Sequence, residues 1–139
     1  MNPNFTGTWK FNHAKSKLEI AAPDETIFVI DHRDPVFRIS RTHVKGEMRD
    51  TFSLDLTTDG QTVLANRGEL RLRSSAHWEG NTLVFDTSFT RAGEEATNVV
   101  RYDLVDNGRS LVAEESFRSR SMNYDNVWVL DRIKQDSNA

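Results

Sequence analysis

The sequence predicts an all-β protein, an antiparallel up-and-down meander barrel of about eight to ten strands. Apolar and polar residues alternate with period two along most of the chain. Short separators containing Gly, Asn or Asp interrupt this alternation repeatedly, and no segment carries an apolar stripe at helical spacing. Strands of about ten residues joined by tight turns suit a tilted, closed barrel without free edges. A sandwich is the competing architecture, but no connection has the length of a Greek-key crossover.

The alternation predicts ten strands in chain order. They lie near 5–12, 25–32, 36–44, 47–57, 61–67, 69–79, 82–91, 95–106, 109–118 and 122–133. Turn residues separate most of them, namely Asp34-Pro35, Lys45-Gly46, Asp59-Gly60, Glu79-Gly80-Asn81, Ala92-Gly93 and Asn107-Gly108. Connections this short cannot cross over, so strands that are neighbours in sequence should pair antiparallel. The segment His13–Ile20 is the one place for a helical turn or an irregular excursion.

The apolar residues of each strand predict which side faces inward. In chain order these residues are Phe5, Gly7, Trp9 and Phe11; Phe37 and Ile39; Met48, Phe52, Leu54 and Leu56; Leu70, Leu72, Ala76 and Trp78; Leu83, Phe85 and Phe89; Val100, Tyr102 and Leu104; and Leu111, Ala113 and Phe117. On the last strand Tyr124, Trp128 and Leu130 share one side and Val127 and Val129 share the other. Alternation alone does not choose between these two sides.

Length and composition predict a single domain and exclude several kinds of site. The 139 residues fit one domain over 1–139, with an ordered core over about 4–134 and a flexible tail over 135–139. The absence of cysteine excludes disulfides and thiolate metal sites. A net charge of −3 with interspersed signs lacks the basic stripe of a nucleic-acid-binding protein.

The distribution of apolar residues also bears on location. No apolar run reaches the length of a membrane span, so we expect none. The first residues lack the pattern of a signal peptide, which favours a cytoplasmic location. A processed protein expressed from a new Met1 would have the same sequence, so the compartment stays open.

The tripeptide Gly7-Thr8-Trp9 on the first strand, with Arg132 on the last, resembles the lipocalin and fatty-acid-binding-protein (calycin) superfamily. In that superfamily the tryptophan closes the barrel floor and an arginine packs across its face, a favourable cation–π contact. The chain lacks a helix after the eighth strand, and the interval 13–24 is too short for a two-helix lid. The resemblance implies a lipocalin-like small barrel outside the best-known branches, with ten strands as in fatty-acid-binding or nitrobindin-like proteins.

A polar group on the inward side is the candidate chemical site. Arg41, His43 and Asp50 flank the Lys45-Gly46 turn, and simple hairpin pairing would bring Arg41 close to Asp50. Glu115 projects inward by the same alternation. Arg41 is suited to bind an anionic or carbonyl oxygen, and His43 or Asp50 to transfer a proton. The alternative interpretation is a solvated polar mouth or an ion pair that fills the barrel.

The predicted ligand-binding wall combines aromatic residues with these polar ones. Its members are Phe37, Arg41, His43, Phe52, Trp78, Phe85, Phe89, Tyr102, Glu115, Phe117, Tyr124 and Trp128. Core packing is the alternative role for most of the aromatic residues.

No sequence pattern calls for a metal or cofactor. His13, His32 and His77 are expected to be ordinary surface or mouth histidines, and no histidine pair has the spacing of a metal motif. We therefore expect no metal and no cofactor; a haem held by one histidine, as in nitrobindin-like barrels, is an alternative. Nucleophile-elbow, phosphate-loop and dinucleotide motifs are all absent from the sequence.

Three hypotheses about function follow. The first is binding of a small hydrophobic or amphipathic molecule in the barrel interior. The second is a cofactor-independent isomerase, cyclase or lyase, with His43, Asp50 and Arg41 as its catalytic group. The third is a structural protein with a filled interior. A homodimer is a further prediction, because outward-facing valines would form an apolar patch. These valines are Val99, Val112, Val127 and Val129.

Overall fold

The structure is a computed structural model that describes residues 2–133. The strands are β1 (Gly7–Phe11), β2 (Glu25–Arg33), β3 (Val36–Lys45), β4 (Met48–Thr57), β5 (Val63–Arg67), β6 (Leu70–Glu79), β7 (Thr82–Arg91), β8 (Glu94–Val105), β9 (Ser110–Ser119) and β10 (Asn123–Arg132). All ten predicted strands are confirmed, and their bounds agree within two residues. The expected tail 135–139 and the last core position, 134, lie outside the described residues.

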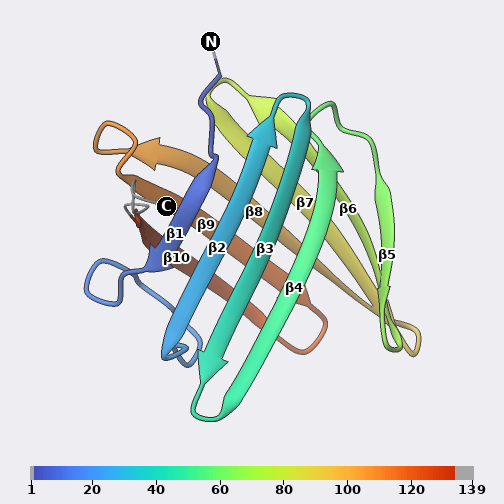
Figure 1. Cartoon of the computed structure of the whole chain (residues 1–139). Coiled ribbons are helices and arrows are strands. Elements are labelled where there is room, and N and C mark those ends of the chain that lie inside the picture. Colours follow the sequence, from blue (N-terminus) through green and yellow to red (C-terminus); the bar gives the residue numbers. More distant parts are fainter. Residues whose placement is uncertain (1, 134–139) are drawn as a thin grey trace.

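The ten strands form one antiparallel sheet that curls into a barrel. Their spatial order is β4-β3-β2-β1-β10-β9-β8-β7-β6-β5. Strands that are neighbours in sequence therefore pair with each other, except β4 and β5, and the first strand β1 pairs with the last strand β10. In Figure 1 the strands β1–β4 cross in front of β7–β10. Strands β4 and β5 stand at the two ends of this order and share no backbone pairing, so the wall has one seam. The predicted up-and-down meander is confirmed.

Trp9 closes one end of the barrel, the floor. Its side chain is fully buried, and the guanidinium carbon of Arg132 lies 4.2 Å from its ring centre. Arg132 Nη1 also donates a hydrogen bond of 2.8 Å to the Thr6 carbonyl. Gly7 has φ +149°, and a Cβ there would lie 2.5 Å from Arg132 Nη1. Glycine is therefore required because the arginine passes directly over its backbone, and the predicted pairing of Trp9 with Arg132 is confirmed.

His32 belongs to this floor, so its expected surface position is wrong. The Phe5 backbone N–H donates to His32 Nδ1 at 3.1 Å, and only 2% of the residue is exposed. Because that nitrogen accepts, the proton sits on Nε2 and is donated to Asp34 Oδ1 at 2.7 Å. Asp34 also accepts from Thr58 Oγ1 and Trp78 Nε1. Burial alone would raise the pKa of Asp34, but these hydrogen bonds and His32 lower it overall.

The segment 12–24 connects β1 to β2 at the opposite end, the mouth, and is irregular as expected. Lys17 pairs with Val127 of β10, Lys45 Nζ donates to the Ala22 carbonyl, and the Gly46 N–H donates to Asp24. These contacts tie the segment to β10 on one side and to the β3–β4 turn on the other. The expected absence of a two-helix lid in 13–24 is confirmed.

Burial settles which side of the last strand faces inward. Trp128 and Leu130 are buried in the core cluster, so their side of β10 is the inner one. Met48 is 75% exposed, so the prediction that it faces inward is wrong; it begins β4 beside the turn. The expected exposed valine patch is also wrong in part. Val129 is buried because residues 16–17 lie along β10, and Val99, Val112 and Val127 are half-buried.

Candidate functional site

A cavity of about 230 Å³ lies inside the barrel between the aromatic floor and the mouth. Many of the predicted binding residues line it, namely Arg41, His43, Phe52, Phe85, Phe89, Tyr102, Glu115 and Trp128. Asp50, predicted only as a catalytic residue, lines it too. Further apolar lining comes from Leu54, Leu72 and Val100, which were predicted to face inward, and from Phe28 of β2, for which no side was predicted. The wall is therefore apolar with polar groups concentrated on a few strands.

Four predicted binding residues do not line this cavity. Phe37 is fully buried in the core, and Trp78 stacks on Phe5 and His32 at the floor. Phe117 and Tyr124 stack on each other with ring centres 4.8 Å apart. Phe117 lines a second hollow of about 360 Å³ instead, bounded mainly by β7, β8 and the β9–β10 turn.

The polar groups on β3 and β4 pair differently from the prediction. The strand register places His43 opposite Asp50 and Arg41 opposite Phe52. Asp50 therefore reaches across the seam to Arg67 of β5, with which it forms an ion pair, rather than to Arg41. The guanidinium of Arg67 also lies over the Phe52 ring, at 5.1 Å from its centre. Arg67 was not predicted, because strands without backbone pairing have no register from which to infer it.

Arg41 is held between two aromatic residues. Its Nη2 donates to the Tyr102 hydroxyl at 3.0 Å, and its guanidinium carbon lies 5.6 Å from the Phe28 ring centre. Tyr102 is almost fully buried, and burial raises the pKa of its phenol despite the neighbouring arginine. The phenol is therefore protonated at neutral pH and can both accept from Arg41 and donate.

His43 is bonded to a neighbouring strand rather than to a carboxylate. Its Nδ1 lies 2.8 Å from Thr26 Oγ1, and its ring centre lies 5.9 Å from that of Trp128. Burial lowers the pKa of His43 below its usual 6.5, and Arg41 lowers it further. The imidazole is therefore neutral at pH 7. With His43 bonded to Thr26 and Asp50 paired with Arg67, these contacts do not favour the acid–base couple considered above.

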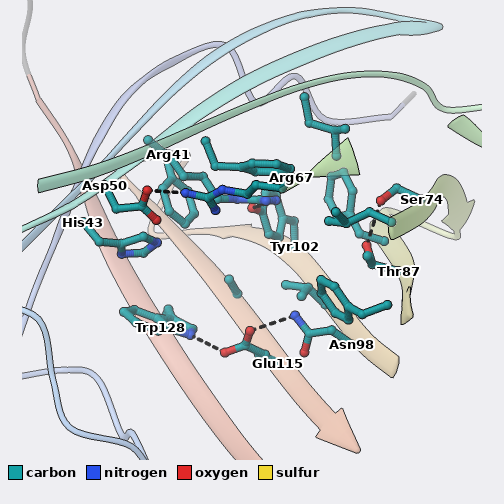
Figure 2. Close-up of a pocket in the computed structure, with 18 of the residues that line it drawn as sticks. Arg41, His43, Asp50, Arg67, Ser74, Thr87, Asn98, Tyr102, Glu115 and Trp128 are labelled. Carbon is teal, nitrogen blue, oxygen red and sulfur yellow. Dashed lines mark hydrogen bonds and ion pairs between the residues drawn. The ribbon is translucent and has the colours of Figure 1, made fainter. Parts of the chain in front are cut away.

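Glu115 is the centre of a second polar cluster, on β8–β10. Its carboxylate accepts from Asn98 Nδ2 at 2.8 Å, from Asn126 Nδ2 at 2.8 Å and from Trp128 Nε1 at 2.9 Å. Figure 2 draws Asn98, Glu115 and Trp128 of this cluster across the cavity from Arg41, Asp50 and Arg67. Asn126 Oδ1 in turn accepts from the Glu19 N–H at 2.7 Å, which links the cluster to the segment 12–24.

Neither Asn98 nor Asn126 was predicted, although a signal was present. Asn98 shares the inward side of its strand with Val100 and Tyr102, and Asn126 shares that of Trp128. Within residues 2–133, no group of three or more His, Asp or Glu side chains is arranged to hold a metal ion.

No protein-family model matches the sequence, and no curated protein matches it either. Solved structures do match. Secretory abundant heat soluble protein 4 from Ramazzottius varieornatus superposes with a TM-score of 0.63 at 12% identity, over 96% of this chain and 99% of the other. A second secretory abundant heat soluble protein from that organism, crystallised from a dimer sample, gives 0.63 at 7% identity, over 95% and 98%. Zebrafish ileal bile acid-binding protein complexed with cholic acid gives 0.56 at 12% identity, over 93% and 98%.

The chain has the fold of a calycin-type β-barrel. The resemblance based on Gly7, Trp9 and Arg132 is thereby confirmed at the level of fold. A search of the described residues for a helix long and apolar enough to cross a membrane finds none.

Proposed function

We propose that this calycin-type barrel binds a small amphipathic molecule in its interior cavity. The observation that carries the proposal is the cavity itself, which combines an apolar wall with two polar clusters inside a nearly closed barrel. Its similarity in fold to a bile acid-binding protein supports the same conclusion. The cavity of about 230 Å³ lies below the range of about 300–1,000 Å³ that is usual for ligand pockets, and the second hollow adjoins it through Leu70 and Phe89.

Apolar burial would supply most of the affinity. A ligand that buries about 200 Å² of apolar surface gains about 5 kcal/mol before the costs of ordering are subtracted. The polar groups would contribute orientation and selectivity, because each hydrogen bond has a modest net value in water. A free energy of about 5 kcal/mol corresponds to a dissociation constant of about 0.2 mM, so we expect submillimolar binding for a well-fitting molecule of this size.

A cavity-filling substitution tests the proposal. Ala113 is buried in the cavity wall between Trp128 and Tyr102. The larger side chain of Ala113→Leu would therefore occupy part of the cavity and reduce its free volume. We expect binding of the neutral solvatochromic dye prodan, followed by its fluorescence, to weaken at least about tenfold. Glu114→Leu is the matched control, because the adjacent residue is exposed and points outward.

Equal dye binding by both variants and the unchanged protein would contradict an interior site. Overpacking costs about 1–3 kcal/mol, so thermal unfolding must show that Ala113→Leu remains folded. The milder Ala113→Val is the second variant if it does not, and its dye binding is then read against Glu114→Val.

A homodimer through the outer face of β8–β10 is part of the proposal. The half-buried Val99, Val112 and Val127 lie on that face, and one structural neighbour was crystallised from a dimer sample.

A further inference from the structure

We propose that the polar head of the bound molecule is a hydrogen-bond donor, an amine or a hydroxyl rather than a carboxylate, and that it binds at Asn98 and Glu115. This inference rests on the proposed function and specifies the chemical class of its ligand. Two independent observations carry it: an acceptor atom of Asn98 that lacks a partner, and a carboxylate at Glu115 that lacks a cationic partner.

The orientation of the Asn98 amide is determined by its neighbour. A carboxylate oxygen can only accept, so the atom of Asn98 that lies 2.8 Å from Glu115 Oε2 must be the nitrogen. The amide oxygen is then directed elsewhere. Asn98 Oδ1 is buried and has no hydrogen-bond partner, the only side-chain atom of the described chain in that state. A buried acceptor without a donor is destabilising, and a ligand donor would remove this cost.

Asn126 provides the comparison within the same cluster. It donates to Glu115 Oε1 as Asn98 donates to Oε2, but its own Oδ1 accepts from the Glu19 backbone N–H. Both ends of Asn126 are therefore satisfied by the protein. Asn98 differs from Asn126 in lining the cavity, and it is the amide whose oxygen lacks a donor. The unmet hydrogen bond thus belongs to a residue of the cavity wall.

Glu115 adds negative charge to the same wall. Its three partners are neutral N–H donors, and no Lys, Arg or His nitrogen within residues 2–133 forms a salt bridge with it. A carboxylate has about four acceptor positions, and the hydrogen bonds to Glu115 occupy two on Oε1 and one on Oε2. The remaining position is on Oε2, the oxygen bonded to Asn98. Two acceptors, Glu115 Oε2 and Asn98 Oδ1, are therefore available to a ligand donor on this wall.

The neighbouring strands add two hydroxyl groups to the cavity wall. Thr87 lies opposite Asn98 in the β7–β8 register and shares a hydrogen bond of 3.1 Å with Ser74. In Figure 2 Arg41 and Arg67 lie above the cavity, Asn98 and Glu115 lie below it, and Ser74 and Thr87 lie at the right between them. A carboxylate head would be repelled by Glu115 here and would find no donor in Asn98 Oδ1. An amine or alcohol is complementary to both.

Three probes with the same tail and different heads test the inference. The unchanged protein is titrated with n-octylamine, n-octanol and n-octanoate at pH 7.5 and constant ionic strength, each in competition with prodan. We expect the amine and the alcohol to bind about tenfold more tightly than the carboxylate, the factor given by one hydrogen bond to a partly charged site. If the amine binds more tightly than the alcohol, the negative charge of Glu115 contributes to the preference for donor heads. If the two bind equally, the preference comes from hydrogen bonding alone.

Asn98→Leu removes the unpaired acceptor, together with the hydrogen bond to Glu115 Oε2, at nearly constant size. In this variant we expect the advantage of the amine and the alcohol over the carboxylate to fall to about threefold or less. Thr97→Val is the matched control, because Thr97 is the exposed neighbour on the same strand. If Asn98→Leu does not fold, Asn98→Ser keeps a small polar group there and is measured in its place.

The outcomes separate this inference from the proposed function. Octanoate binding as tightly as octylamine, or an unchanged preference in the Asn98 variant, overturns the donor-head inference and leaves an interior binding site intact. Failure of prodan and of all three probes to bind overturns both. A preference for donor heads that depends on Asn98 supports both.

Discussion

Replacing Gly7 by alanine tests the floor of the barrel. The added Cβ would lie 2.5 Å from Arg132 Nη1, so the guanidinium must move. Its movement weakens the stacking on Trp9 and the 2.8 Å hydrogen bond to the Thr6 carbonyl, together worth about 1–2 kcal/mol. The backbone strain of alanine at φ +149° adds about 1–3 kcal/mol. We therefore expect Gly7→Ala to lower the free energy of unfolding by about 2–5 kcal/mol.

A second glycine separates the two contributions. Gly68 in the β5–β6 turn has φ +62°, and a Cβ there would meet no atom within 4 Å. Gly68→Ala should therefore cost only the backbone strain, about 1–2 kcal/mol. Urea unfolding followed by tryptophan fluorescence measures both variants. With a slope of about 2 kcal/mol per M, Gly7→Ala should unfold about 0.5–1 M earlier than Gly68→Ala. Equal midpoints would refute the close approach of Arg132 to the floor glycine.

Two further predictions concern pH and assembly. In the folded protein the pKa of His43 is below the 6.5 of the unfolded chain. Between the folded pKa and 6.5 the unfolded chain therefore binds more protons than the folded protein does, so the free energy of unfolding falls as the pH drops below 6.5. His43→Gln should flatten this fall in urea titrations between pH 7 and 5, and an identical slope in both proteins would contradict it. The proposed dimer should appear in native mass spectrometry and be lost in Val112→Lys; a monomer at all concentrations would rule it out.

The sequence was most informative where structure is set by neighbours along the chain. Alternation and turn residues determined all ten strands, because each hairpin is fixed by its own turn and its own apolar side. The contact of Trp9 with Arg132 was also predictable, since a meander that closes must bring its first and last strands together. The same alternation directed Arg41, His43 and Glu115 to the cavity.

The remaining features depend on contacts between strands that are distant in sequence. Asp50 pairs with Arg67 across a seam without backbone hydrogen bonds, so no register could predict it. His32 is buried by Phe5 and Trp78, which come from the start of the chain and from β6. Alternation could have placed Asn98 on the inward side of its strand. The sequence gives no indication, however, that the oxygen of its amide lacks a hydrogen-bond donor.

The three tryptophans allow the most direct test of interior binding. Trp128 Nε1 donates to Glu115 in the cavity wall, whereas Trp9 and Trp78 donate to Phe5 and Asp34 at the floor. In a two-dimensional proton–nitrogen NMR titration with n-octylamine, we expect the indole signal of Trp128 to shift saturably at one equivalent. The signals of Trp9 and Trp78 should move far less. Shifts confined to the floor tryptophans, or no saturable shift of Trp128, would contradict the proposal that the cavity binds a ligand.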